Sequence, residues 1–155
     1  SEVLERSQKL LGRVLKGAKV RVRNDMDEPA PRVVADAPRM TEIFVNLLRN
    51  ARKAIVRRFE EGDPDASVGT KRLVVVEAFV KDPYVALVFT NNGLPVPAAD
   101  QEKIFLPSFQ ARDPEKNGLG LPETAAPLKQ MGGAIRCESL GDKGPRFIPT
   151  LPKAP

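Results

Sequence analysis

The sequence predicts an α/β fold, a two-layer sandwich in which a mixed, mostly antiparallel sheet is covered on one face by helices. Three observations lead to this prediction. One long stretch repeats its apolar residues with the period of a helix, several short stretches have the pattern of strands, and helical and strand stretches alternate along the chain. The 155 residues are enough for one domain with a core, and no internal repeat divides them. We therefore expect a single domain over residues 1–155.

The chain opens with a predicted helix over residues 2–18, with Ser1 as its cap and Gly17 as its stop signal. Its apolar face is formed by Val3, Leu4, Leu10, Leu11, Val14 and Leu15. Residues 19–24 then alternate between basic and apolar side chains, which predicts a half-buried strand. After a turn with two prolines, we expect a second short strand over residues 32–35.

The central element is a predicted long helix over residues 38–60. Its apolar residues are spaced three and four apart: Phe44, Leu47, Leu48, Ala51, Ala54 and Ile55. Asn46, Asn50 and Lys53 fall at i, i+4 and i+7, so they share a second, polar stripe beside the apolar one. Taken alone, this stripe is explained equally well by a solvated surface and by a binding site.

The second half of the chain predicts two hairpins separated by loops and short helices. The first hairpin pairs residues 72–81 with 84–90 around Asp82-Pro83, and a loop follows over 91–99. A short helix is expected over 98–104 and a longer one over 119–131. In the longer helix Pro127 predicts a kink or an early break, and two glycines at 132–133 mark its end. Strands over 134–139 and 146–151 form the last hairpin.

Composition excludes several kinds of site. The chain has no histidine and one cysteine, so histidine acid–base catalysis, histidine metal sites and cysteine clusters are absent, and a reducing compartment is expected. No apolar run is long enough to cross a bilayer and no signal-peptide pattern opens the chain, which predicts a cytoplasmic protein without direct membrane contact. The net charge of +5 favours phosphate-bearing ligands. No nucleic-acid motif is present, so nucleic acid is not expected as a partner.

Four segments occur in an order that is similar to a known family. They are the asparagine-bearing helix, then residues 91–97 (NNGLPVP), 104–109 (IFLPSF) and 117–121 (NGLGL). Together, over about residues 39–152, they resemble the catalytic, ATP-binding domain of sensor histidine kinases, a member of the superfamily that includes DNA gyrase and the large heat-shock chaperone. The resemblance implies a Bergerat-type ATP-binding fold and a role in two-component signal transduction.

The resemblance also implies a role for each site residue. Asn50 offers an amide oxygen as a magnesium ligand, and Asn46, one turn earlier, reaches the metal's water or a phosphate and is the catalytic candidate. Lys53 neutralises phosphate charge. Asn91 and Gly93 correspond to the box that binds adenine. The remaining nucleotide-binding residues are expected at the start of a helix, where backbone N–H groups approach the phosphates: Gly118, Leu119 and Gly120.

One residue separates kinase from hydrolase in this family. Hydrolases carry a Glu one turn before the Asn-Ala pair to activate water, whereas Asn46 is an amide with no useful basicity. A second register would use Glu42 as the base and Asn46 as the metal ligand, as in a DNA-associated ATPase. However, it would place Leu47 where the family has a small residue, so the Asn50-Ala51 register is preferred.

The kinase prediction implies specific partners. The phosphoryl acceptor is a histidine on a separate dimerisation domain of the same protein, and residues 1–18 would follow that domain. A response regulator would then receive the phosphoryl group.

The sequence departs from the family at the adenine end of the site. Asn91 stands where the family has an Asp that accepts a hydrogen bond from the adenine amine, and Pro95 replaces the second glycine. Lys116 and Asn117 replace residues of the second glycine box. An alternative prediction follows from these changes: a degenerate domain with weak or no ATP binding that serves as a protein-interaction module.

Overall fold

The structure, a computed structural model, describes residues 1–62, 71–106, 121–139 and 144–155. Five strands form one sheet in the order β1-β2-β3-β5-β4, with β1 parallel to β2 and all other pairs antiparallel. The strands are β1 (Val20–Asn24), β2 (Arg72–Lys81), β3 (Tyr84–Asn91), β4 (Ala134–Ser139) and β5 (Pro145–Pro152). The mixed, mostly antiparallel sheet confirms the predicted fold class.

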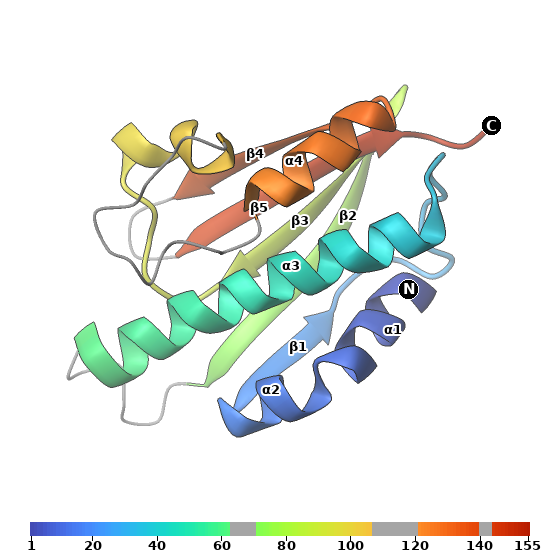
Figure 1. Ribbon diagram of the computed structural model, residues 1–155. Helices are drawn as coiled ribbons and strands as arrows, with labels where there is room; N and C mark the ends of the chain where they lie inside the picture. Colours follow the sequence, from blue (N-terminus) through green and yellow to red (C-terminus); the bar gives the residue numbers. More distant parts are fainter. Residues whose placement is uncertain (63–70, 107–120, 140–143) are drawn as a thin grey trace.

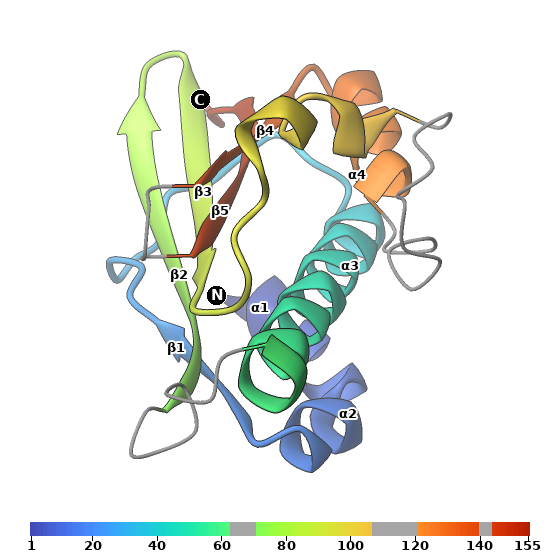
Figure 2. The same ribbon diagram turned by 90° about the vertical axis from the view of Figure 1, so that its left-hand side faces the viewer.

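The helices lie on one face of this sheet (Figure 1). Figure 2, turned by 90°, shows the sheet on one side and the helices α1, α2, α3 and α4 together on the other. The core lies between the two layers, where Val74, Val76, Phe89 and Leu151 of the sheet are buried with Ile43, Leu47 and Leu48 of α3. No helix in the described part of the chain is long and apolar enough to span a bilayer.

Helix α3 (Ala37–Val56) is the longest element and closely matches the predicted central helix. Asp36 caps it by accepting a hydrogen bond from the Arg39 N–H at 3.2 Å, and a proline occupies its first turn. At its other end the backbone continues as a π-helical segment, η1 (Arg57–Gly62). The Phe44 ring meets the Phe89 ring edge-on at 5.0 Å, which ties α3 to the central strand β3.

The prediction of one helix over residues 2–18 is wrong. The segment forms two helices, α1 (Glu2–Leu10) and α2 (Gly12–Gly17). Two local features account for the break. The Ser7 hydroxyl donates to the Val3 carbonyl at 2.7 Å, a back-bond that bends helices, and Gly12 has low helix propensity. The bend lets this segment pack closely, and its buried residues belong to the main core: Leu4, Leu11 and Leu15.

The predicted strand over residues 32–35 is also wrong. Only Val33 pairs, in an isolated antiparallel bridge with Lys153 near the end of the chain. Backbone hydrogen bonds flank this bridge, from the Val34 N–H to the Pro152 carbonyl and from the Ala154 N–H to the Arg32 carbonyl. Prolines in both segments lack the N–H that a longer ladder needs, so pairing stays at one bridge.

The short helix predicted over residues 98–104 is replaced by two 3₁₀ turns, η3 (Ala98–Asp100) and η4 (Lys103–Phe105). Neither is long enough to continue as an α-helix. Phe105 is partly buried against the core.

Helix α4 (Leu121–Gln130) continues through Pro127, so the predicted early break does not occur. Proline removes one backbone donor, and the fully buried Leu128 just beyond it holds the next turn against the core. The helix ends as predicted. Gly132 has a φ of 82°, its N–H donates to Lys129, and the Gly133 N–H donates to Leu128, which together form a Schellman cap.

Candidate functional site

The polar stripe of α3 lies along the edge of the buried face. Asn50 is 5% exposed and sits among core residues, while Asn46 and Lys53 are half-buried one turn before and after it. The helix period brings the three side chains to one side of α3, as predicted. A buried amide flanked by a second amide and a cation is unusual for a solvated surface, because buried polar groups carry a desolvation cost. The stripe is therefore a candidate binding surface.

The loop after β3 is folded tightly around Asn91. The Asn91 Oδ1 accepts a hydrogen bond from the Gly93 N–H at 2.8 Å, and Asn91 is only 2% exposed. The same loop packs directly on α3, where the Leu94 N–H donates to the Ala54 carbonyl at 3.1 Å. These contacts bring the loop to the half of α3 that carries Asn50 and Lys53, although the two segments are far apart in sequence.

Gly93 makes this approach possible. A Cβ added at Gly93 would lie 2.5 Å from the Ile55 nitrogen and 2.6 Å from the Ala54 oxygen, both of which are backbone atoms of α3. Gly144, at the start of the last strand segment, has a φ of 76°, and its added Cβ would overlap the Asn91 backbone oxygen. Gly93 thus lets the loop approach α3, and Gly144 lets the chain before β5 approach the Asn91 backbone.

Two residues that hold this loop escaped the sequence prediction. Asn92 accepts from the Leu73 N–H at 3.0 Å and donates to the Lys71 carbonyl at 2.6 Å. Arg58, beyond the end of α3, donates to the Asn92 carbonyl at 2.6 Å. The Asn-Asn pair was visible in the sequence, but the partner of Arg58 lies 34 residues away and no local pattern indicates it.

The remaining predicted site residues, Gly118, Leu119 and Gly120, lie outside the described residues, as does Lys116. Leu121, the first residue of α4, is buried. The structure thus brings together the α3 stripe and the Asn91 loop.

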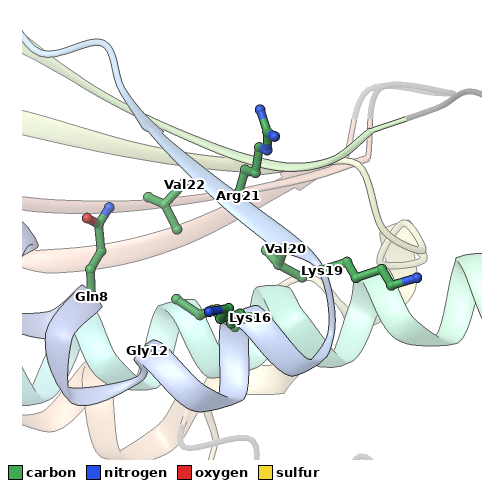
Figure 3. Close-up of a pocket in the computed structure, with 8 residues that line it drawn as sticks. Gln8, Gly12, Lys16, Lys19, Val20, Arg21 and Val22 are labelled. Carbon is green, nitrogen blue, oxygen red and sulfur yellow. The ribbon is translucent and has the colours of Figure 1, made fainter.

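A separate groove of about 410 Å³ lies between the first two helices and the edge strand β1 (Figure 3). It is lined by Gln8, Gly12, Leu15, Lys16, Lys19, Val20, Arg21 and Val22. In Figure 3 the Arg21 side chain lies on the far side of β1 from the helices. None of the predicted site residues lines this groove, so it is distinct from the α3 stripe.

A family model for the histidine kinase-, DNA gyrase B- and HSP90-like ATPases matches residues 35–155. The chain belongs to this ATPase family. The match includes the α3 stripe and the Asn91 loop, and it agrees with the resemblance that the sequence motifs indicate.

Relatives of this ATPase domain include sensor histidine kinases. The chain is 27% identical over 152 residues to sensor histidine kinase ZraS of Salmonella typhimurium, covering 98% of this chain and 30% of that protein. It is 30% identical over 161 residues to sensor kinase CckA of Brucella abortus, covering 99% of this chain and 16% of that protein. The chain therefore spans less than a third of the length of these relatives.

Solved structures of other proteins have the same fold as this chain. The nucleotide-free catalytic domain of histidine kinase ThkA superposes with a TM-score of 0.77 at 25% identity, covering 99% of this chain and 94% of that chain. ShkA in complex with AMPPNP gives a TM-score of 0.75 at 21% identity, covering 99% of this chain and 30% of that chain. The two-layer architecture described above is thus the one found in histidine kinase catalytic domains.

The burial of α3 also bears on the register of the family's asparagine box. Ala51 is 2% exposed and Asn50 is buried beside it, whereas Glu42 is exposed. A small buried residue after the ligand asparagine suits the Asn50-Ala51 register. An exposed Glu42 is poorly placed for the alternative register, in which it would act as a sheltered general base.

Proposed function

We propose that this domain binds Mg²⁺–ATP and presents its terminal phosphoryl group to a histidine on a separate domain of the same protein. The observation that carries the proposal is the placement of the buried Asn50 between Asn46 and Lys53, with the Asn91 loop packed on the same half of α3. Membership of the ATPase family supports the choice of nucleotide.

The chemistry of the α3 stripe fits a magnesium nucleotide. Among the described residues, no three His, Cys, Asp or Glu side chains gather closely enough to hold a metal ion. A cation here would therefore take the Asn50 amide oxygen, phosphate oxygens and water, a ligand set that suits Mg²⁺. Asn46 would orient a water or a phosphate, and Lys53 would offset phosphate charge.

The other predicted ligands belong to the two ends of the nucleotide. Asn91 and Gly93 would form the base-binding end. Gly118, Leu119 and Gly120 would offer backbone N–H groups to the phosphates just before α4, where a helix N-terminus favours anions.

Phosphoryl transfer is proposed in place of rapid hydrolysis because Asn46 is an amide. It orients groups but does not take a proton from water at neutral pH. When bound, Mg²⁺–ATP would supply the phosphoryl group, and the residues of this chain would bind and align it. The chain contains no histidine, so the acceptor lies elsewhere.

The proposed partners are a histidine-containing dimerisation domain and a response regulator. One solved structure holds ThkA in complex with the response regulator TrrA, at a TM-score of 0.71 and 24% identity, and this supports the second partner. We propose that α1 and α2 connect the ATPase domain to the dimerisation domain. A cytoplasmic location, without nucleic acid or direct membrane contact, suits an ATP-dependent signalling reaction.

Calorimetric titration with a non-hydrolysable ATP analogue, with and without Mg²⁺, tests the proposal. We expect magnesium-dependent binding that weakens by at least about tenfold in Asn50→Ala, since a charge-assisted contact contributes about 1.5–3 kcal/mol. The matched control is Asn24→Ala, which removes an exposed asparagine amide at the end of β1 and should bind like wild type. If the folded wild-type domain shows no binding at millimolar analogue, or if both variants lose affinity equally, the proposal is wrong.

A further inference from the structure

The Asn91 amide is buried with one of its two ends unpaired. Its Oδ1 accepts the Gly93 N–H at 2.8 Å, while its Nδ2 is buried and has no hydrogen-bond partner among the described residues. The Gly93 N–H fixes the orientation of the amide, because an N–H donor must meet the oxygen and not the NH₂ group. A buried donor without a partner costs about 1–3 kcal/mol, so such groups are rare in folded proteins. A ligand atom that accepts a hydrogen bond would remove this cost.

From this geometry we infer that the base-binding end of the site is complementary to a 6-oxopurine nucleotide, such as GTP or ITP, more than to ATP. The inference rests on the proposed function, in which Asn91 faces position 6 of a purine. Adenine carries an amine there, which is a donor, whereas guanine carries a carbonyl oxygen, which is an acceptor. The Asn91 Nδ2 therefore pairs with the oxygen of guanine and opposes the amine of adenine.

Rotation of the amide does not rescue adenine binding without cost. If Asn91 turned its oxygen toward the adenine amine, its NH₂ group would face the Gly93 N–H. Gly93 is itself buried, and the loop has no room to shift because the backbone of α3 lies directly against it. The buried Gly93 donor would then lose its acceptor, which exchanges one unpaired donor for another.

The wild-type chain tests the inference directly by calorimetric titration with ATP, GTP and ITP in the presence of Mg²⁺. We expect GTP and ITP to bind about 10- to 100-fold more tightly than ATP, the range that one matched or mismatched buried hydrogen bond produces. ITP has the same oxygen at position 6 as GTP but lacks the 2-amino group. Similar affinities for GTP and ITP would therefore assign the preference to position 6.

The variant Asn91→Asp replaces the unpaired Nδ2 donor with a carboxylate oxygen, which is an acceptor. A carboxylate still accepts the Gly93 N–H, but its second oxygen is an acceptor and suits the adenine amine. We expect the preference to reverse, so that ATP binds more tightly than GTP and ITP. The matched control is Asn24→Asp, the same chemical change at an exposed asparagine whose Oδ1 accepts the Met26 N–H at 3.0 Å, and it should keep the wild-type preference.

The outcomes separate this inference from the proposed function. If the wild-type chain binds ATP at least as tightly as GTP and ITP, the inference is overturned and the nucleotide site stands. Binding of GTP and ITP without ATP supports the inference and shows that ATP is the wrong phosphoryl donor, while the proposed nucleotide site itself stands. If the folded wild-type chain and Asn91→Asp bind none of the three, the proposed function fails and the inference fails with it. Should Asn91→Asp not fold, the wild-type affinity ratio alone decides.

Discussion

Two adjacent asparagines at the end of β3, Asn91 and Asn92, differ in how their side-chain amides are hydrogen-bonded. Both polar ends of Asn92 are used within the protein, because it donates to the Lys71 carbonyl and accepts from the Leu73 N–H. Asn91 uses only its oxygen. Asn92 therefore anchors the loop to β2, whereas Asn91 leaves a donor for a ligand. Their side chains are identical, so only the three-dimensional surroundings distinguish the anchor from the specificity residue.

Cys137 gives a residue-scale prediction for the dependence of stability on pH. Burial, with a smaller contribution from the charge of Glu138, raises the pKa of the Cys137 thiol to about 12. In the unfolded chain the thiol ionises near pH 8.5, so above that pH the folded state holds a proton that the unfolded state has released. This contribution to stability is therefore lost as pH rises, by up to about 1.4 kcal/mol per pH unit between about pH 8.5 and 12.

Urea denaturation of wild type and Cys137→Ala at about pH 8 and about pH 10 measures this effect. All other titratable groups are common to the two proteins, so the difference in stability between wild type and Cys137→Ala isolates the thiol. We expect the stability advantage of wild type to shrink at the higher pH. An advantage that is equal at both pH values would mean that the thiol ionises as readily in the folded state as in the unfolded chain.

At the scale of elements, the sequence predicts best where a pattern is long and local. The period of α3 extends over five turns, and the strands of the two hairpins are mostly runs of apolar residues, so these elements are confirmed. The break between α1 and α2 depends on one hydroxyl back-bond at Ser7, and the bridge at Val33 depends on a partner at the far end of the chain. The Val33 pairing is therefore invisible in a window of a few residues, whereas the break after α1 is local but leaves unchanged the apolar period from which one helix was predicted.

In the candidate site, too, the local pattern could be predicted from the sequence and the long-range contacts could not. The stripe of Asn46, Asn50 and Lys53 could be predicted because one helix carries all three at fixed spacing. The contact of Arg58 with the Asn92 carbonyl joins residues 34 positions apart, and only the fold brings them together. Local spacing thus predicts which residues share a face, whereas tertiary packing decides what that face meets.

Gly93→Ala tests the packing of the Asn91 loop on α3. The new Cβ would overlap backbone atoms of Ala54 and Ile55, which cannot move without displacing the helix. We expect a loss of about 3 kcal/mol in the free energy of unfolding, measured by urea denaturation, together with weaker nucleotide binding.

The matched control is Gly12→Ala in α2, where an added Cβ meets nothing within 4 Å. Alanine suits a helix better than glycine by up to about 1 kcal/mol, so this variant should be unchanged or more stable. Equal stabilities of Gly93→Ala and Gly12→Ala would show that the Asn91 loop does not pack tightly against the α3 backbone.

At the scale of the whole molecule, charge is distributed unevenly. The first 24 residues hold seven basic and two acidic side chains, which equals the net charge of +5 for the entire chain. The remainder is balanced. The first 24 residues form α1, α2 and β1, and some of them line the groove of Figure 3. One group of basic side chains therefore lies beside the edge strand, and a second lies along α3, where Arg49 and Arg52 accompany Lys53.

The packing of the same N-terminal segment also bears on whether α1 and α2 unfold together with the rest of the domain. A leading helix that merely follows another domain would contribute little to the fold. In the structure α1 packs along α3, and Leu11 is 1% exposed within the main core, while its neighbour Leu10 is 67% exposed. We therefore expect residues 1–18 to belong to the same cooperative unit and to unfold together with the sheet.

Two adjacent leucines provide the test. Leu11→Ala leaves a cavity in the core and should lower the free energy of unfolding by about 2–5 kcal/mol, whereas Leu10→Ala removes exposed surface and should change it by less than about 0.5 kcal/mol. Urea denaturation followed by circular dichroism gives both values from one cooperative transition. If the two variants are equally stable, or if Leu11→Ala melts only a separate early phase, α1 and α2 are an appendage and the core begins at β1. A single transition shifted by Leu11→Ala alone would establish that the ATPase domain includes its first helices.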